Sequence, residues 1–97
     1  MDGEKMQETL ESMRKEINEI DAAMLRLFAE RMAVVSRISD YKEQQGIAVQ
    51  NTQREAEIKA NIKNCVSEPY VDAATDFINE TLRISREFQQ TRRSKMY

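Results

Sequence analysis

Polar side chains in this chain occupy helix positions where the spacing predicts an apolar residue. Apolar residues recur three and four positions apart from Leu10 to Leu27, and the next position of that row holds Arg31. A guanidinium stays charged at any ordinary pH, so burying it without a partner is very costly. Arg31 therefore either reaches water, pairs with Glu30 or Asp40, or binds an anionic ligand.

Three further side chains repeat this anomaly. Lys42 lies three helical turns beyond Arg31, so both point in nearly the same direction, and about 16 Å between them leaves room for a small ligand. Ser85 and Gln89 continue an apolar row that includes Leu82. Such residues often bond only to their own helix or to water. If the two helices pack together, however, all four polar groups converge.

Glu55 also has two interpretations. With Thr52 it forms the pattern Thr-x-x-Glu of a helix capping box, which leaves a carboxylate oxygen able to accept a hydrogen bond from a ligand hydroxyl. Arg54 beside it either faces solvent or pairs with Glu57.

Three helices are predicted to position these residues. Only two glycines and one proline occur among 97 residues, which favours long helices. The predicted helices span residues 7–45 (ending near Gly46), 53–64 and 68–92. The predicted fold is thus a single all-α domain of residues 1–97, with helices arranged long, short, long.

The third helix is expected to begin at a cap and to pack on the first helix. Ser67 can cap its N-terminus, and Pro69 fits its first turn. Packing on the first helix is expected to bury Phe77, Ile78 and Leu82.

The first helix is too long for one chain to cover. At about 1.5 Å per residue it reaches nearly 60 Å, whereas a domain of this size has a radius of gyration of only about 13 Å. A second copy is the simplest cover for its apolar stripe, so we predict a homodimer. Arg14 lies about 25 Å and roughly 100° from Arg31 on this helix, so the two cannot hold the same small molecule. Arg14 is either a surface residue or part of the partner's site.

The composition narrows the possible functions. The 15 basic and 17 acidic residues nearly balance, which gives no reason to expect nucleic acid or an anionic membrane as a partner. No apolar run approaches the about 20 residues of a membrane span and no signal pattern is present, so a cytoplasmic protein is expected. Without histidine, Ser-His and Cys-His pairs and most zinc sites are excluded. The single cysteine, Cys65, is interpreted as a packed residue at a helix end.

The ordered set of polar residues resembles that of the all-helical (AroQ-class) chorismate mutases. The likeness covers about residues 7–92 and rests on the segments MRKEINEIDAAMLRLFAERMAVVSRISDYK, VQNTQREAEI and ISREFQ. It implies an intertwined homodimer of three-helix chains, with two active sites that each take residues from both chains. The implied activity is the rearrangement of chorismate to prephenate, in phenylalanine and tyrosine biosynthesis.

The resemblance implies how the substrate is held and activated. Arg31 would bind a carboxylate in its own site and Arg14 one in the partner's site, while Lys42 and Gln89 would hydrogen-bond the ether oxygen. The rearrangement is concerted, so no nucleophile, metal or cofactor is expected. Restraint of the compact substrate conformer and stabilisation of negative charge on the ether oxygen are the catalytic tasks.

The remaining candidates have supporting roles by the same resemblance. Glu55 would take the ring hydroxyl, Ser85 would lie near the ring carboxylate, and Arg54 would support Glu55. One position departs from the pattern, because family members often carry aspartate where this chain has Asn51. An amide still forms hydrogen bonds, so we expect a modified activity rather than a lost one.

Two alternatives remain open on the sequence alone. An isochorismate pyruvate lyase on the same scaffold binds a substrate with the same carboxylates and ether oxygen, although Glu55 weakly favours the mutase. A non-catalytic helical module would use the apolar stripe only to oligomerise, with Arg31 setting the register of the partners.

Overall fold

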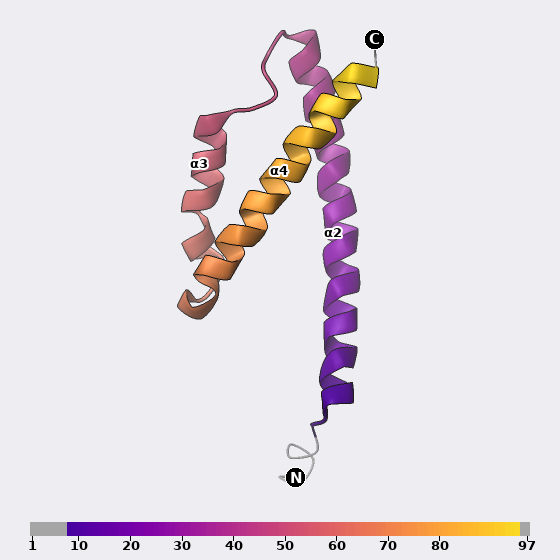
Figure 1. Ribbon diagram of the computed structural model, residues 1–97, viewed down its shortest axis with the longest axis vertical. Helices are drawn as coiled ribbons and strands as arrows, with labels where there is room; N and C mark the ends of the chain where they lie inside the picture. The colour runs from indigo at the N-terminus through magenta and orange to yellow at the C-terminus, as the bar shows by residue number, and fades with distance from the viewer. Residues whose placement is uncertain (1–7, 96–97) are drawn as a thin grey trace. The chain divides into compact units, whose positions relative to one another are not determined.

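The computed structural model describes residues 8–95, with side chains for residues 8–93, and every regular element in that range is helical (Figure 1). In chain order the elements are α2 (Leu10–Gln44), α3 (Thr52–Ala60), the 3₁₀ turns η1 (Ile62–Asn64) and η2 (Glu68–Tyr70), and α4 (Val71–Lys95). The predicted all-α class, with a long, a short and a long helix, is confirmed.

Contacts between residues divide the chain into two units, Met1–Ala33 and Val34–Tyr97. Helix α2 contributes to both, so its residues 10–33 belong to the first unit and its residues 34–44 to the second. All of α3 and α4 belongs to the second unit. Across the described range, none of the helices combines the length and apolarity that crossing a membrane requires.

Helix α2 begins at Leu10 because Thr9 caps it. The Thr9 hydroxyl accepts a hydrogen bond from the Ser12 backbone N–H at 3.0 Å, and the Ser12 hydroxyl accepts one from the Thr9 N–H at 3.0 Å. This reciprocal pair is a capping box with serine in place of the usual glutamate. The helix therefore starts later than predicted, and residue 7 lies outside the described residues.

The apolar stripe of α2 is exposed in the first unit of a single chain. Its side chains have exposed fractions between 42% and 60%. They are Leu10, Met13, Ile17, Ile20, Met24 and Leu27. Apolar side chains stabilise a fold only when they are removed from water, so a continuous exposed stripe is typical of an interaction surface.

Helix α2 ends at the glycine that the sequence indicates. Gly46 has a φ of 67°, a left-handed conformation that residues with a Cβ rarely adopt. Its N–H donates to the carbonyl of Glu43 at 3.2 Å, and the N–H of Ile47 donates to the carbonyl of Lys42 at 2.7 Å. These two bonds form a Schellman motif, which satisfies the last carbonyls of the helix and turns the chain back.

Helix α3 is capped by Asn51, and not by Thr52 as predicted. Oδ1 of Asn51 accepts a hydrogen bond from the backbone N–H of Arg54 at 3.0 Å, and the Asn51 backbone is extended. Because Asn51 takes the cap position, Thr52 becomes the first helical residue and the predicted capping box with Glu55 is wrong. The predicted continuation to residue 64 is also wrong, since α3 ends at Ala60 and η1 follows it.

The third helix begins in two steps. Pro69 lies in η2 as predicted for a first turn, but the α-helix proper starts at Val71. Ser67 occupies the cap position, but its side chain forms no capping bond. Pro69 has no N–H to donate, and the N–H of Tyr70 already donates to the Ser67 carbonyl at 2.9 Å, so the predicted serine cap is wrong. Cys65 is exposed rather than packed, because the turn it ends buries Ile62 instead.

One face of α4 is buried within the second unit, where α4 contacts α3 and both 3₁₀ turns. Leu82, Ser85 and Gln89 each have an exposed fraction of 6%, and Ile78 is half-buried. The predicted row is therefore the inward face. Phe77 comes one residue before Ile78, so it points about 100° away from this row. It is 56% exposed in the single chain, and the prediction of its burial there is wrong.

The last turns of α4 are joined to the end of α2. Nε and Nη2 of Arg92 donate to the two carboxylate oxygens of Asp40 at 2.8 and 2.9 Å. Nη2 of Arg93 donates to the backbone carbonyl of Ile47 at 2.8 Å. Figure 1 shows the two helix ends beside each other. These bonds fix the loop after Gly46 against α4.

Acid is expected to release this junction. Arg92 donates hydrogen bonds to Asp40 and lowers the pKa of that carboxyl below its ordinary value of 3.8. A carboxyl whose pKa is lower in the folded state stabilises the fold above its unfolded pKa, and loses that contribution as pH falls through the folded value. We therefore expect Asp40→Asn to lower the urea midpoint of unfolding at about pH 7, at fixed protein concentration, and to have a progressively smaller effect as the pH falls below the ordinary carboxyl pKa of 3.8.

Glu80→Gln is the matched control. Hydrogen bonding to Arg83 also lowers the pKa of Glu80, but this pair lies within one helix on its exposed face. Its loss should change the midpoint less at every pH. An Asp40→Asn effect of the same size at neutral and at acid pH would contradict the role given to Arg92.

Candidate active site

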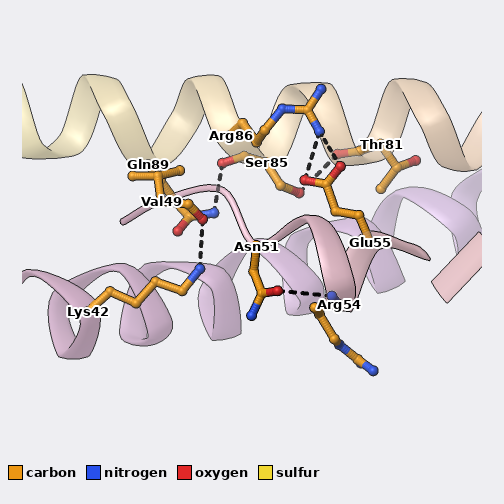
Figure 2. A network of polar contacts seen from close by, with 9 residues as sticks. All are labelled: Lys42, Val49, Asn51, Arg54, Glu55, Thr81, Ser85, Arg86 and Gln89. Atoms are coloured by element: carbon orange, nitrogen blue, oxygen red, sulfur yellow. Dashed lines mark hydrogen bonds and ion pairs between the residues drawn. The ribbon is translucent and has the colours of Figure 1, made fainter. Parts of the chain in front are cut away.

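Six of the eight predicted site residues lie in the second unit. They come from the end of α2, the loop before α3, α3 itself and α4, and are Lys42, Asn51, Arg54, Glu55, Ser85 and Gln89. Figure 2 shows all six, with the polar contacts that hold them. The other two, Arg14 and Arg31, lie on α2 in the first unit.

The ammonium group of Lys42 is held by the loop that follows α2. Its Nζ donates to the backbone carbonyl of Val49 at 2.7 Å. The Val49 side chain is only 5% exposed, so its backbone is anchored in the core of this unit. The turn at Gly46 brings the loop back over the helix end that carries Lys42. The fold itself therefore directs this positive charge.

The amide of Gln89 is buried and only partly satisfied. Its Nε2 donates to the Ser85 carbonyl one turn earlier at 3.2 Å, while Oε1 has no hydrogen-bond partner among the described residues. An unsatisfied buried acceptor costs about 1–3 kcal/mol. Oγ of Ser39 and Nε of Arg93 are also buried without a partner among the described residues. In Figure 2 the Gln89 amide and the Lys42 ammonium both point toward the segment at Val49. The predicted approach of these two donors is thus compatible with the geometry of the second unit.

Ser85 bonds to the backbone of its own helix, which is one of the two alternatives that the sequence left open. Its hydroxyl donates to the carbonyl of Thr81 at 2.9 Å, one helical turn earlier, and the side chain is buried. This bond satisfies the hydroxyl hydrogen and leaves oxygen lone pairs as acceptors. A role for Ser85 near a ligand carboxylate stays a prediction.

Glu55 forms an ion pair with Arg86, a residue that the sequence patterns did not single out. Nη1 of Arg86 lies 2.7 Å from Oε1 and 2.8 Å from Oε2 of Glu55. The side chains are 16% exposed for Glu55 and 31% for Arg86, so the pair is largely shielded from water. The contact joins α3 to α4 across 31 positions of sequence. Such charge-assisted bonds are among the stronger contacts in proteins.

A sequence signal for Arg86 did exist. It follows Leu82 by four residues and precedes Gln89 by three, so it shares the inward side of α4 with both. A cation in an apolar helical row is the same signal that marked Arg31. The segment ISREFQ thus contains three polar residues that face the rest of the unit.

Asn51 and Arg54 have structural roles at the start of α3. Asn51 accepts from the Arg54 backbone N–H, as described above, and an aspartate carboxylate could accept the same bond. The Arg54 guanidinium lies 3.4 Å from Oε2 of Glu57, and both side chains are more than half exposed. The predicted alternative in which Arg54 pairs with Glu57 is confirmed.

The two arginines of the first unit differ in their surroundings. Arg14 is exposed and Arg31 is half-buried in the single chain. Their predicted contacts with ligand carboxylates stay predictions.

The polar groups of the second unit line two hollows. Lys42 and Asn51 line one of about 450 Å³, together with the exposed apolar side chains of Ile38, Tyr41 and Ile47. Glu55 and Arg86 line another of about 510 Å³, whose wall includes Lys59, Asn79 and Leu82. Both volumes fall within the range of small-ligand pockets.

These side chains can orient and polarise an anionic ligand. Lys42 and Gln89 supply fixed donors, and Glu55 supplies an acceptor for a hydroxyl. Among residues 8–93, no group of three or more His, Cys, Asp or Glu side chains is placed to hold a metal ion. The donors and the acceptor that are present are of the kind that can restrain a ligand's conformation and stabilise charge on it.

Comparison with known proteins identifies related sequences. Residues 13–90 match the family model of chorismate mutase type II. A chorismate mutase of Methanocaldococcus jannaschii is 37% identical over 67 residues, which cover 69% of this chain and 68% of that protein. No solved structure matches the chain. All eight predicted site residues, from Arg14 to Gln89, fall within the matched family region.

Replacing Asn51 tests whether it acts mainly as a helix cap. Asn51→Ala removes the acceptor of the Arg54 N–H, so we expect the free energy of unfolding to fall by about 1 kcal/mol. Asn51→Asp keeps the acceptor and adds negative charge at the helix N-terminus, so stability should be retained or slightly raised. Urea unfolding measures both, with Gln50→Ala as a control outside the helix. Equal losses for the two Asn51 variants would exclude the capping role.

Proposed function

The chain belongs to the chorismate mutase type II family, and we propose that it is an isomerase that converts chorismate to prephenate at sites built from two copies of the chain. The family match over residues 13–90 is the observation that carries this proposal. The resulting prephenate serves the biosynthesis of aromatic amino acids. A cytoplasmic location stays a prediction from the composition.

Charge stabilisation is the main task of the second unit in this reaction. As the C–O bond of chorismate stretches, negative charge grows on the ether oxygen. Lys42 and Gln89 donate hydrogen bonds to that oxygen, and the loop contact of Lys42 at Val49 supports a fixed direction for its charge. Glu55 accepts a hydrogen bond from the ring hydroxyl, and Ser85 lies near the ring carboxylate. No general base is needed, because bond making and bond breaking are concerted.

The two substrate carboxylates require the cations of the first unit. Arg31 binds one carboxylate in its own site, and Arg14 binds the other in the site of the partner chain. Guanidinium groups suit this task because they form two parallel hydrogen bonds with a carboxylate. Arg54 and Asn51 support the start of α3, from which Glu55 projects.

A homodimer is the second part of the proposal. The apolar stripe of α2, from Leu10 to Leu27, is 42% to 60% exposed in a single chain. A symmetric second copy would remove this stripe from water on both chains. In that dimer, residues 7–92 act as one catalytic domain.

The direct test is a product assay. The purified protein should consume chorismate and form prephenate, without added metal or cofactor. Formation of salicylate and pyruvate from isochorismate, in place of prephenate from chorismate, would assign the lyase activity instead. No turnover of either substrate by a folded protein would leave only a helical interaction module.

Subunit mixing tests whether Arg14 acts across the dimer. Arg14→Ala and Arg31→Ala should each lower kcat/KM by about 10²-fold or more, because each removes a carboxylate partner. Refolding the two variants together should restore about a quarter of wild-type activity, since about half of the dimers are mixed and each mixed dimer has one intact site.

The matched control mixes Arg31→Ala with Lys42→Ala. Both residues serve the site of their own chain in this proposal, so a mixed dimer contains no intact site. No recovery is expected. Equal recovery in both mixtures, or none in either, would exclude the assignment of Arg14 to the partner's site.

The pH dependence tests the placement of Gln89. Gln89 is neutral, so wild-type activity should be broad across neutral pH. Gln89→Glu can donate to the ether oxygen only while protonated, so we expect its optimum to move to acid pH, below about 6. Gln90→Glu, one residue further along α4 at an exposed position, should leave the profile unchanged. A Gln89→Glu profile of wild-type shape would remove Gln89 from the ether oxygen.

A further inference from the structure

The ion pair of Glu55 and Arg86 has a consequence for catalysis beyond holding two helices together. Both oxygens of Glu55 lie within 2.8 Å of a single nitrogen, Nη1 of Arg86. The carboxylate is 16% exposed, so it sits in a setting where water screens its charge weakly. Arg86 therefore holds the carboxylate in position and offsets its negative charge.

Arg86, and not the neighbouring Arg54, is the cation that faces Glu55. The Arg54 guanidinium is 66% exposed and pairs with Glu57. Figure 2 shows Arg54 directed away from Glu55, while Arg86 reaches down to it from α4. Lys59 also lines the hollow that contains Glu55, but no ion pair joins them among the described contacts. The motif arginine next to Glu55 therefore does not neutralise it.

A carboxylate in this site requires neutralisation. Chorismate carries two carboxylates, so an uncompensated Glu55 would add a third negative charge beside a dianion. Repulsion between like charges in one binding site disfavours binding, and this repulsion is stronger where water is excluded. A cation paired with Glu55 removes this penalty and keeps the carboxylate as a hydrogen-bond acceptor.

The geometry of the ion pair leaves Glu55 able to accept a further hydrogen bond. An ionised carboxylate has about four lone-pair positions, and contact with one nitrogen of Arg86 occupies one side of the group. The remaining positions can accept a hydroxyl hydrogen. Because Arg86 contacts both oxygens, it also limits rotation of the carboxylate about its terminal bond.

We propose that Arg86 is a positioning residue for the mutase reaction, which holds the Glu55 carboxylate and neutralises it so that Glu55 binds the substrate hydroxyl without repelling the substrate's two carboxylates. This inference rests on the proposed function. Arg86 acts through Glu55 and does not itself touch the substrate.

A double-mutant cycle on kcat and KM for chorismate tests the proposal. Arg86→Gln should raise KM by about 10-fold or more, because it leaves Glu55 unpaired near a dianion. Arg86→Lys should recover much of this loss, since it restores the charge. Glu55→Gln removes the charge that Arg86 neutralises, so adding Arg86→Gln in that background should change KM by less than about 2-fold.

Ionic strength gives an independent measure. Salt screens the repulsion between Glu55 and the substrate, so the ratio of KM in Arg86→Gln to KM in wild type should fall as salt rises from about 0.02 to 0.5 M. Arg83→Gln is the matched control on the same helix, because Arg83 pairs with Glu80 and Glu87 on an exposed face. Its KM should stay within about 2-fold of wild type at both salt concentrations.

The outcomes separate this inference from the function on which it rests. Suppose that the wild type forms prephenate and that Arg86→Gln raises KM equally in the wild-type and the Glu55→Gln backgrounds. That result would overturn the role of Arg86 and leave the proposed function standing. A wild-type protein that forms no prephenate would overturn both. If Arg86→Gln fails to fold, KM is measured for Arg86→Lys in the wild-type background and in the Glu55→Gln background. An increase in KM of the same size in both backgrounds then contradicts the proposal.

Discussion

Burying a charged or amide group without a hydrogen-bond partner costs several kcal/mol, and this cost organises the second unit. Several inward polar side chains there are met by a group from elsewhere in the fold or from their own helix, although the Ser39 hydroxyl has no such partner among the described residues. Glu55 meets Arg86, Lys42 meets the Val49 carbonyl, and the Gln89 amide meets the Ser85 carbonyl. The packing of α3 on α4 therefore includes Glu55, one of the groups proposed to bind the substrate.

This dependence explains how so small a chain can catalyse a reaction without covalent chemistry. A concerted rearrangement needs donors that stay in place while charge develops, and donors held by the fold need little reorganisation. Lys42 is directed by a loop that a glycine turn and an arginine of α4 fix in place. Glu55 is directed by an arginine on another helix. The contacts that stabilise the scaffold are thus also the contacts of the side chains proposed for catalysis.

Patterns within one helix could be predicted from the sequence, and contacts between helices could not. The stop at Gly46, the inward row of Leu82, Ser85 and Gln89, and the apolar stripe of α2 all follow from local spacing and conformational preference. The cap of α3 was missed because Asn51 and Thr52 are both good caps, and only the observed backbone distinguishes them.

Two further misses have a different cause. Arg86 carries a local signal, but its partner lies 31 positions away, and sequence spacing does not tell which carboxylate a long flexible side chain will reach. The exposure of Phe77 depends on which side of α4 turns inward, and that is decided by packing rather than by hydrophobicity. The role of Arg14 depends on a second chain and that of Arg31 on a bound ligand, so both stay predictions.

The final turns of α4 give the molecule an unusual vulnerability. Arg92 and Arg93 anchor Asp40 and the Ile47 carbonyl, and so brace the loop whose Val49 carbonyl holds Lys42. A protease that trimmed the chain just after Gln89 would spare every residue assigned to the substrate, yet it would loosen the support of the ammonium group. Premature stop codons in this region would consequently be more harmful than their distance from the substrate suggests.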